Sequence, residues 1–202
     1  FVCSGFHDEL ILQFALRSCK PNDTLQFSSG RFMIDEIPKV TMANGNIFYA
    51  VMYPSFFGTD NSFDISVCGM GARGENRTEF IIAPTAFDNI PSSDEGTFIS
   101  WYTGIYQFSG LHLKDFRITL KTNQHKCCLI DMSHFGHGCV ENLVLYVNEQ
   151  TANPVEGCVG IRSYMGSDTG TQQIWSRIVV LTANKEYKGF YEAFQLGAEH
   201  HI

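Results

Sequence analysis

The sequence is poor in charge and lacks the patterns that define several protein classes. Charged residues make up 17% of its 202 positions, against 44% apolar and 13% aromatic residues, and this balance excludes an intrinsically disordered chain. No segment approaches the ~18 consecutive apolar residues of a membrane-spanning helix, and no heptad repeat of a coiled coil is present. We therefore expect a globular protein that does not insert into a membrane.

The charge balance and the cysteines limit the classes of binding partner and metal site that the chain can have. Fourteen Lys and Arg against 21 Asp and Glu give a net charge of −7, which disfavours nucleic acid and anionic membranes as partners. The seven cysteines contain no CxxC motif, so a zinc ribbon or a thioredoxin-like motif is not expected, and an odd number cannot pair fully within the chain. The sequence predicts neither a metal ion nor another cofactor.

One helix followed by many short strands is the pattern along the chain. In residues 7–19 apolar side chains recur at positions 10, 11, 14 and 15, close to a helical period, and Pro21 follows. The remainder consists of short β-like runs that Gly, Asn, Asp, Ser and Pro separate. We expect strands at residues 24–27, 31–34, 47–53, 63–68, 79–82, 97–102, 111–120, 127–132, 143–147, 158–162, 174–181 and 189–196.

A weak repeat in the second half indicates how these strands are arranged. Residues 113–118, 140–145 and 175–180 each carry an apolar residue, two polar residues and then an apolar–x–apolar run. Two alternating strand types at a spacing of roughly 20–40 residues are typical of a solenoid whose coils stack on one another. A sandwich or a barrel would show more hairpin dipeptides, and Asn44-Gly45 is the only one in this sequence.

Two segments carry a resemblance to a known fold family. Residues 7–34 contain the helix, a PNDT turn and a GRFMI strand, and residues 63–82 contain a strand, a Gly-x-Gly, a short loop, a Thr and a second strand. Both segments resemble coils of the pectate-lyase-type right-handed parallel β-helix. The resemblance implies an all-β solenoid in a single domain over residues 1–202, with a capping helix at 7–19 and coils over 24–202. We expect this domain to be part of a longer β-helix, or a subunit whose open end a neighbouring subunit covers.

The resemblance also implies a function. The superfamily includes polysaccharide lyases, glycosidases, mannuronan epimerases and phage tailspikes, which hold long polysaccharides along the helix surface. We therefore expect a tailspike-like, polysaccharide-recognising protein, extracellular or virion-associated, that forms a homotrimer or a larger assembly. If it is an enzyme, it would depolymerise its glycan by hydrolysis or β-elimination. The alternative is a non-enzymatic structural or adhesive segment of a virion fibre or surface protein.

Carbohydrate chemistry directs attention to charged side chains that follow equivalent strands. Hydrolysis needs two carboxyl groups, whereas β-elimination needs a base together with a cation that neutralises the uronate. Asp131, Arg162 and Glu192 follow corresponding strands, so we expect them in one column as the catalytic residues; the alternative is a solvated polar stripe. Further charged candidates are Glu156, Asp168 and Glu199. The candidate aromatic residues for stacking on sugar rings are Tyr164, Trp175, Tyr187 and Tyr191.

Three other motifs are expected to be structural. Residues 69–74 spell the GxGxxG of a dinucleotide site, but a polar segment and a strand follow instead of a helix, which favours a tight turn. Residues 134–137 hold two histidines whose spacing could share a metal with Asp131, but the neighbouring glycines favour a polar loop. Cys128 and Cys158 lie at the start of equivalent strands, so we expect them to stack as buried thiols rather than as a disulfide.

Overall fold

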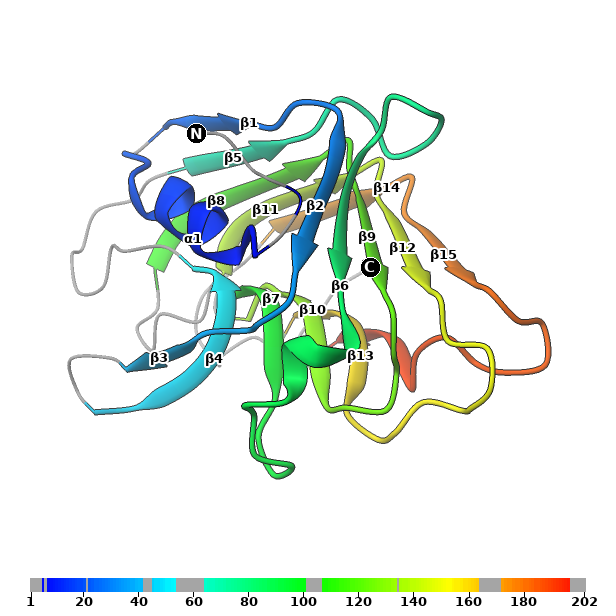
Figure 1. The fold of residues 1–202 in the computed structure, drawn as a ribbon. Coiled ribbons are helices and arrows are strands. Elements are labelled where there is room, and N and C mark those ends of the chain that lie inside the picture. The colour runs from blue at the N-terminus through cyan, green and yellow to red at the C-terminus, as the bar shows by residue number, and fades with distance from the viewer. Residues whose placement is uncertain are drawn as a thin grey trace.

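A computed structural model describes residues 5, 7–20, 22–41, 45–53, 64–100, 107–133, 135–163 and 172–196. In these ranges the chain forms one α-helix, one short 3-10 helix (η1, Pro84–Phe87) and sixteen strands (Figure 1). The fold is therefore dominated by β-structure with one helix near its beginning, as the sequence predicted.

The described strands form three sheets, which we name A, B and C. In spatial order, sheet A contains β1 (Thr24–Gln26), β5 (Asp64–Cys68), β8 (Gln107–Lys114), β11 (Phe135–Glu141) and β14 (Gln172–Ser176). Sheet B contains β2 (Gly30–Ile34), β6 (Thr78–Ile82), β9 (Arg117–Leu120), β12 (Val144–Val147) and β15 (Val179–Thr182). Sheet C contains β3 (Lys39–Thr41), β4 (Ile47–Met52), β7 (Gly96–Ser100), β10 (Cys127–Asp131), β13 (Cys158–Ser163) and β16 (Glu192–Leu196).

The chain visits the three sheets in rotation. A strand of sheet A is followed by one of sheet B and then one of sheet C, and the next pass adds a strand beside each of them (Figure 1). Every described pair is parallel except β3 with β4, which form an antiparallel hairpin at one edge of sheet C. Parallel strands in stacked sheets that are visited in this order are compatible with a β-helix or solenoid.

One hydrophobic core joins the three sheets. Phe80 of β6 lies at its centre, with its ring centroid 5.1 Å from that of Phe98 in sheet C and 5.5 Å from that of Phe116 at the corner between β8 and β9. All three rings are buried, and burying a Phe side chain contributes about 1.5–3 kcal/mol. The sheets are therefore fixed relative to one another, so their outward faces present side chains in defined columns.

The helix α1 (Glu9–Arg17) packs against the first strands and is shorter than the predicted 7–19. The Asp8 carboxylate accepts a hydrogen bond from the Met33 backbone N–H at 3.0 Å, and Glu9 accepts one from that of Asp35 at 3.3 Å. These contacts turn the 12, 15 and 16 positions inward and leave Leu10 exposed, so the predicted apolar face was only partly correct. No helix in the described ranges is long and apolar enough to cross a membrane.

Single residues with positive φ make the corners between sheets A and B. Asp115 (φ 64°), Asn142 (φ 52°) and Arg177 (φ 53°) occupy the same place in successive passes, and the Asn142 amide donates a hydrogen bond to the Asp115 carboxylate at 2.7 Å. The predicted repeat of residues 113–118, 140–145 and 175–180 is thus confirmed as paired strands. The predicted single strands 111–120 and 174–181 were wrong, because each contains one of these corners.

Two strands were missed by the sequence analysis. One is the short edge strand β3, and the other is β11, which begins at Phe135 where a loop was expected over 134–137. β11 pairs with β8 on one side and β14 on the other, and this pairing satisfies its backbone in spite of its glycines. His134 and the side chain of His137 lie outside the described residues.

The glycine-rich segment 69–74 is a tight turn between β5 and β6, as predicted. A Cβ on Gly69 would lie 2.2 Å from the Asp115 carbonyl oxygen and 2.8 Å from the Thr78 Cβ, so the backbone requires glycine there. Gly74 has φ 81°. No described helix follows before β6 begins at Thr78, which removes the nucleotide-binding interpretation.

Candidate functional site

A polar column runs across sheet C, with Arg162 at its centre. Asp131 of β10 is the register partner of Arg162 on one side, and the Arg162 Nη1 lies 3.4 Å from the Asp131 Oδ2. Gln195 of β16 is the register partner on the other side and accepts a hydrogen bond from the Arg162 Nε at 2.8 Å. The predicted adjacency of Asp131 and Arg162 is thus confirmed, while their catalytic role stays a prediction.

Glu95 completes this cluster, and the sequence analysis missed it. It lies just before β7, and its carboxylate accepts two hydrogen bonds from the Arg162 guanidinium, at 2.6 Å from Nη1 and 2.5 Å from Nη2. The two residues are 67 positions apart in the chain, so no local pattern links them. The one available signal was the acidic pair Asp94-Glu95 directly before a strand of the predicted ladder.

The environment keeps Arg162 protonated. Burial alone would lower its pKa, but the hydrogen bonds that Arg162 donates to Glu95 and the negative charges around the guanidinium outweigh burial and raise the pKa above its ordinary value. Arg162 is therefore a fixed cation. It positions the Glu95 and Asp131 carboxylates and is unsuited to accept a proton.

A cavity of about 280 Å³ opens beside this cluster. It lies between strands β4, β7 and β10 of sheet C and the turn before β7. Its polar wall combines the carboxylates of Asp94, Glu95 and Asp131 with the hydroxyl groups of Thr97 and Ser100. The ring of Phe48 adds an apolar surface. The site can therefore accept several hydrogen bonds from a ligand that also offers an apolar face.

Glu192 does not lie in the predicted column. Its register partner is Val159, three positions before Arg162 in β13, and Gln195 takes the expected place. The prediction aligned Glu192 with Arg162 because it began the last strand at residue 189, whereas β16 begins at Glu192. Glu192 is nevertheless connected to the cluster, since the Gln195 amide donates to its carboxylate at 2.5 Å.

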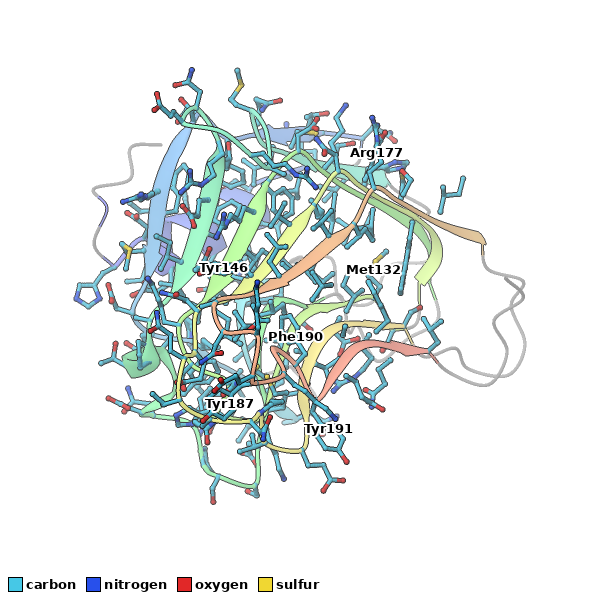
Figure 2. All side chains as sticks on the ribbon, turned by 90° about the vertical axis from the view of Figure 1, so that its right-hand side faces the viewer. Met132, Tyr146, Arg177, Tyr187, Phe190 and Tyr191 are labelled. Carbon is cyan, nitrogen blue, oxygen red and sulfur yellow. The ribbon has the colours of Figure 1, made fainter. Side chains whose placement is uncertain are left out.

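The predicted sugar-stacking residues do not gather at this cavity. Trp175 packs on the core at the last pass, with its ring centroid 5.8 Å from that of Phe194, and its Nε1 is buried without a partner among the described residues. Figure 2 looks onto this end of the stack and shows Tyr187 and Tyr191 beside Phe190, in the segment that joins β15 to β16. Tyr164 lies outside the described residues.

The remaining charged candidates lie elsewhere. Glu156 lines a smaller cavity of about 180 Å³ together with His125, whose ring stacks on Phe87 at 4.9 Å. Asp168 and Glu199 lie outside the described residues. Nothing brings Glu156 to the Arg162 cluster in the part of the chain that the structure describes.

The cysteine stack differs from the prediction by one residue. Cys127, not Cys128, is the register partner of Cys158, and their Sγ atoms lie 3.7 Å apart in the core, where both are free thiols. A strand that slips by one residue in such an alignment exchanges its inward and outward faces. Within the described ranges, no group of three His, Cys, Asp or Glu side chains could hold a metal ion.

A second charged cluster, on sheet B, was also missed. Glu79 of β6 is buried, and its register partners are Arg31 on β2 and Arg117 on β9. The Glu79 carboxylate accepts from the Arg77 Nη2 at 2.7 Å and from the Thr119 hydroxyl at 2.6 Å. The available signal was a charged residue at the same place before each of three apolar–x–apolar runs.

Comparison of the chain with protein-family models, with curated proteins and with solved structures finds no match.

Proposed function

We propose that the chain is a right-handed parallel β-helix of the pectate-lyase type that recognises a polysaccharide on the outer face of sheet C. Rotation of the chain through three sheets of parallel strands supports the β-helix, and right-handed crossovers are the rule for parallel strands. The stacked strands give an extended face along which repeating sugar units can lie. The proposal includes an extracellular or virion-associated location and assembly into a homotrimer.

The observation that carries the proposal is the cavity beside the Arg162 cluster. Sugar hydroxyl groups donate hydrogen bonds to carboxylates, and the apolar face of a pyranose ring packs on aromatic side chains. The cavity offers both, through Glu95 and Asp131 on one wall and Phe48 on another. Arg162 holds two of the carboxylates in place before a ligand arrives, so less conformational entropy is lost on binding.

Depolymerisation would use the same face. In hydrolysis, Glu95 and Asp131 are the carboxyl groups that a glycosidic bond would meet. β-Elimination is less favoured, because Arg162 is already paired with Glu95 and Asp131 and stays protonated, so it neither neutralises a uronate carboxylate nor removes a proton. Recognition precedes either reaction, so the proposal commits to recognition.

A panel of neutral and acidic polysaccharides tests the proposal. Binding is measured by glycan array and calorimetry, and cleavage by reducing ends and by the ultraviolet absorbance of unsaturated products. We expect at least one glycan to bind, and Asp131→Asn to weaken it about tenfold, the effect of losing a charge-assisted hydrogen bond.

Asp88→Asn is the matched control, since Asp88 is exposed and does not line the cavity. Equal glycan affinity of the Asp131→Asn and Asp88→Asn variants would show that the cavity is not the binding site. Failure to bind any glycan would favour the alternative, a non-enzymatic segment of a fibre. Sedimentation of the same samples measures the oligomeric state.

A further inference from the structure

Three arginines surround one carboxylate on the outward side of sheet B. The Glu79 carboxylate lies 2.7 Å from the Arg77 Nη2, 3.2 Å from the Arg117 Nε and 3.6 Å from the Arg31 Nε. One guanidinium would suffice to neutralise Glu79, so the cluster carries two positive charges in excess. This surplus stands out in a chain whose net charge is −7.

The arginines still have hydrogen-bond donors to offer. Arg77 uses Nε and Nη2 on Glu79 and Nη1 on the Gly74 carbonyl, whereas Arg117 donates only through Nε, to the Thr119 hydroxyl at 3.0 Å. Neither Nη atom of Arg117 or Arg31 has an acceptor among the described residues. The Arg31 side chain is 70% exposed, so solvent molecules and ligands reach the cluster.

The central arginine is already held in place. The Arg117 guanidinium carbon lies 4.3 Å from the ring centroid of Tyr146, whose hydroxyl donates to the Asn148 side chain at 3.1 Å. Figure 2 labels Tyr146 on this sheet, toward the end of the stack that faces the viewer. A guanidinium that is stacked on one face and paired at Nε presents its two Nη groups as a preformed fork, the geometry that carboxylate, sulfate and phosphate groups accept.

We propose that Arg31, Arg77 and Arg117 form a binding site for an oxyanion group, a carboxylate, sulfate or phosphate, on the outer face of sheet B. Mutual repulsion supports it: burial and the charges of Arg77 and Arg31 lower the pKa of Arg117 despite the attraction of Glu79. A bound anion relieves that repulsion. The site is separate from the cavity on sheet C and does not depend on the polysaccharide proposal.

Titration with inorganic sulfate and phosphate, at constant ionic strength set with chloride, tests the site by calorimetry. We expect saturable binding that Arg31→Gln weakens about two- to fivefold, the range of an exposed ion pair. Arg117→Gln should weaken it about tenfold or more, as expected for a partly buried, charge-assisted contact. Arg73→Gln, which removes an exposed arginine from the turn before β6, should leave the affinity unchanged.

Glu79→Gln gives a readout of opposite sign. It removes the competing carboxylate, so the folded variant should bind sulfate more tightly, which a purely structural role of the arginines does not predict. Circular dichroism establishes that the variant is folded at the temperature of the titration. Absence of saturable binding, or equal effects of Arg31→Gln and Arg73→Gln, would overturn the proposal.

Further titrations distinguish an anionic group on a sugar chain from a free anion as the ligand. Oligogalacturonate is compared with free galacturonate and with a neutral oligosaccharide of equal length. Tighter binding of the oligomer than of the free acid would assign the site to an anionic sugar chain, and equal or weaker binding to a free anion. Asp131→Asn should leave sulfate affinity unchanged, so failure here is distinguishable from failure of the site on sheet C.

Discussion

Replacing Glu79 by Gln is the substitution whose consequence follows most directly from the described contacts. The change removes one negative charge and almost no volume, so the packing around Phe80 and Thr119 stays the same. It leaves three guanidinium groups around a neutral amide, and two of them, Arg77 and Arg117, are largely buried. We therefore expect a loss of stability that arises from electrostatics alone.

The size of the effect can be bounded. Breaking a buried ion pair by removing one partner costs about 3–5 kcal/mol. Here Arg77 and Arg117 keep about a fifth of their side-chain surface in contact with water, and Arg31 keeps more than half. Solvent screening then places the loss of unfolding free energy near the lower end of this range, at about 3 kcal/mol. In a chain of this size ~1 kcal/mol moves the thermal unfolding midpoint by about 2–4 °C, so Tm should fall by roughly 6–12 °C.

The effect should depend on pH. Burial alone would raise the pKa of Glu79, but hydrogen bonds from Thr119 and Arg77 and the nearby arginine charges outweigh it and lower the pKa below its ordinary value. A carboxylate with a lowered pKa stabilises the folded state above its unfolded pKa, and this contribution is lost as pH falls through the folded pKa. The Tm difference between the two proteins should therefore be full at pH 7 and shrink below about pH 4.

Thermal unfolding of both proteins, followed by circular dichroism and calorimetry from pH 3 to pH 8, measures this. Glu75→Gln is the matched control, because Glu75 is exposed in the preceding turn and should change Tm by less than about 2 °C. A Glu79→Gln variant with the stability of the Glu75→Gln control would refute the reasoning. So would a Tm difference that grows as the solution becomes acidic.

Two substitutions and one labelling experiment test the packing between successive passes of the chain. Asn123→Ala removes a buried amide that donates to the carbonyl groups of Ala152, Lys188 and Gly189, which lie in two later connections between strands. The substitution should lower the free energy of unfolding, measured with denaturant, by about 1–3 kcal/mol. Gly69→Ala forces a Cβ onto the Asp115 carbonyl and should abolish or strongly reduce soluble folded protein. Thiol titration of the native protein should leave Cys127 and Cys128 unreactive until it unfolds, because the hydrogen bond that the Cys127 thiol donates to Cys158, together with burial, raises the pKa of Cys127, and burial raises that of Cys128.

Each of the two substitutions has a control variant in a segment that it affects. Lys185→Ala alters an exposed residue in the connection that contains Lys188 and Gly189 and should cost less than about 0.5 kcal/mol. Gly74→Asn places a residue that tolerates positive φ at an open position and should fold normally. Stability of Asn123→Ala equal to that of Lys185→Ala, a normal Gly69→Ala protein, or rapid native labelling of Cys127 or Cys128 would contradict the packing described above.

The sequence predicted strands well where turn residues bound an apolar run, and poorly where a corner is a single residue. Arg177 breaks the run 174–181 with φ 53°, although arginine has no intrinsic preference for that conformation. Pairing of β14 with β11 and of β15 with β12 imposes the corner, and this cannot be read from one segment. The same long-range pairing makes β11 a strand in spite of its two glycines.

The site was predictable only as far as strand equivalence allowed. Asp131 and Arg162 end corresponding strands, so their contact could be expected, whereas Glu95 reaches Arg162 from a turn that no periodicity marks. Glu192 was displaced because the start of the last strand was misjudged by three residues. The place of a side chain in a column can be predicted when the first residue of each neighbouring strand is known. An error of a few residues in a strand start assigns the side chain to another column.

Mapping a bound glycan onto the chain tests the central proposal most directly. Once the panel yields a glycan, backbone NMR signals are followed during its titration into the wild-type protein and the Asp131→Asn variant. We expect saturable shifts concentrated at Glu95, Thr97, Asp131 and Arg162, with weaker binding in the variant. Shifts confined to other faces, or unchanged affinity in Asp131→Asn, would contradict it.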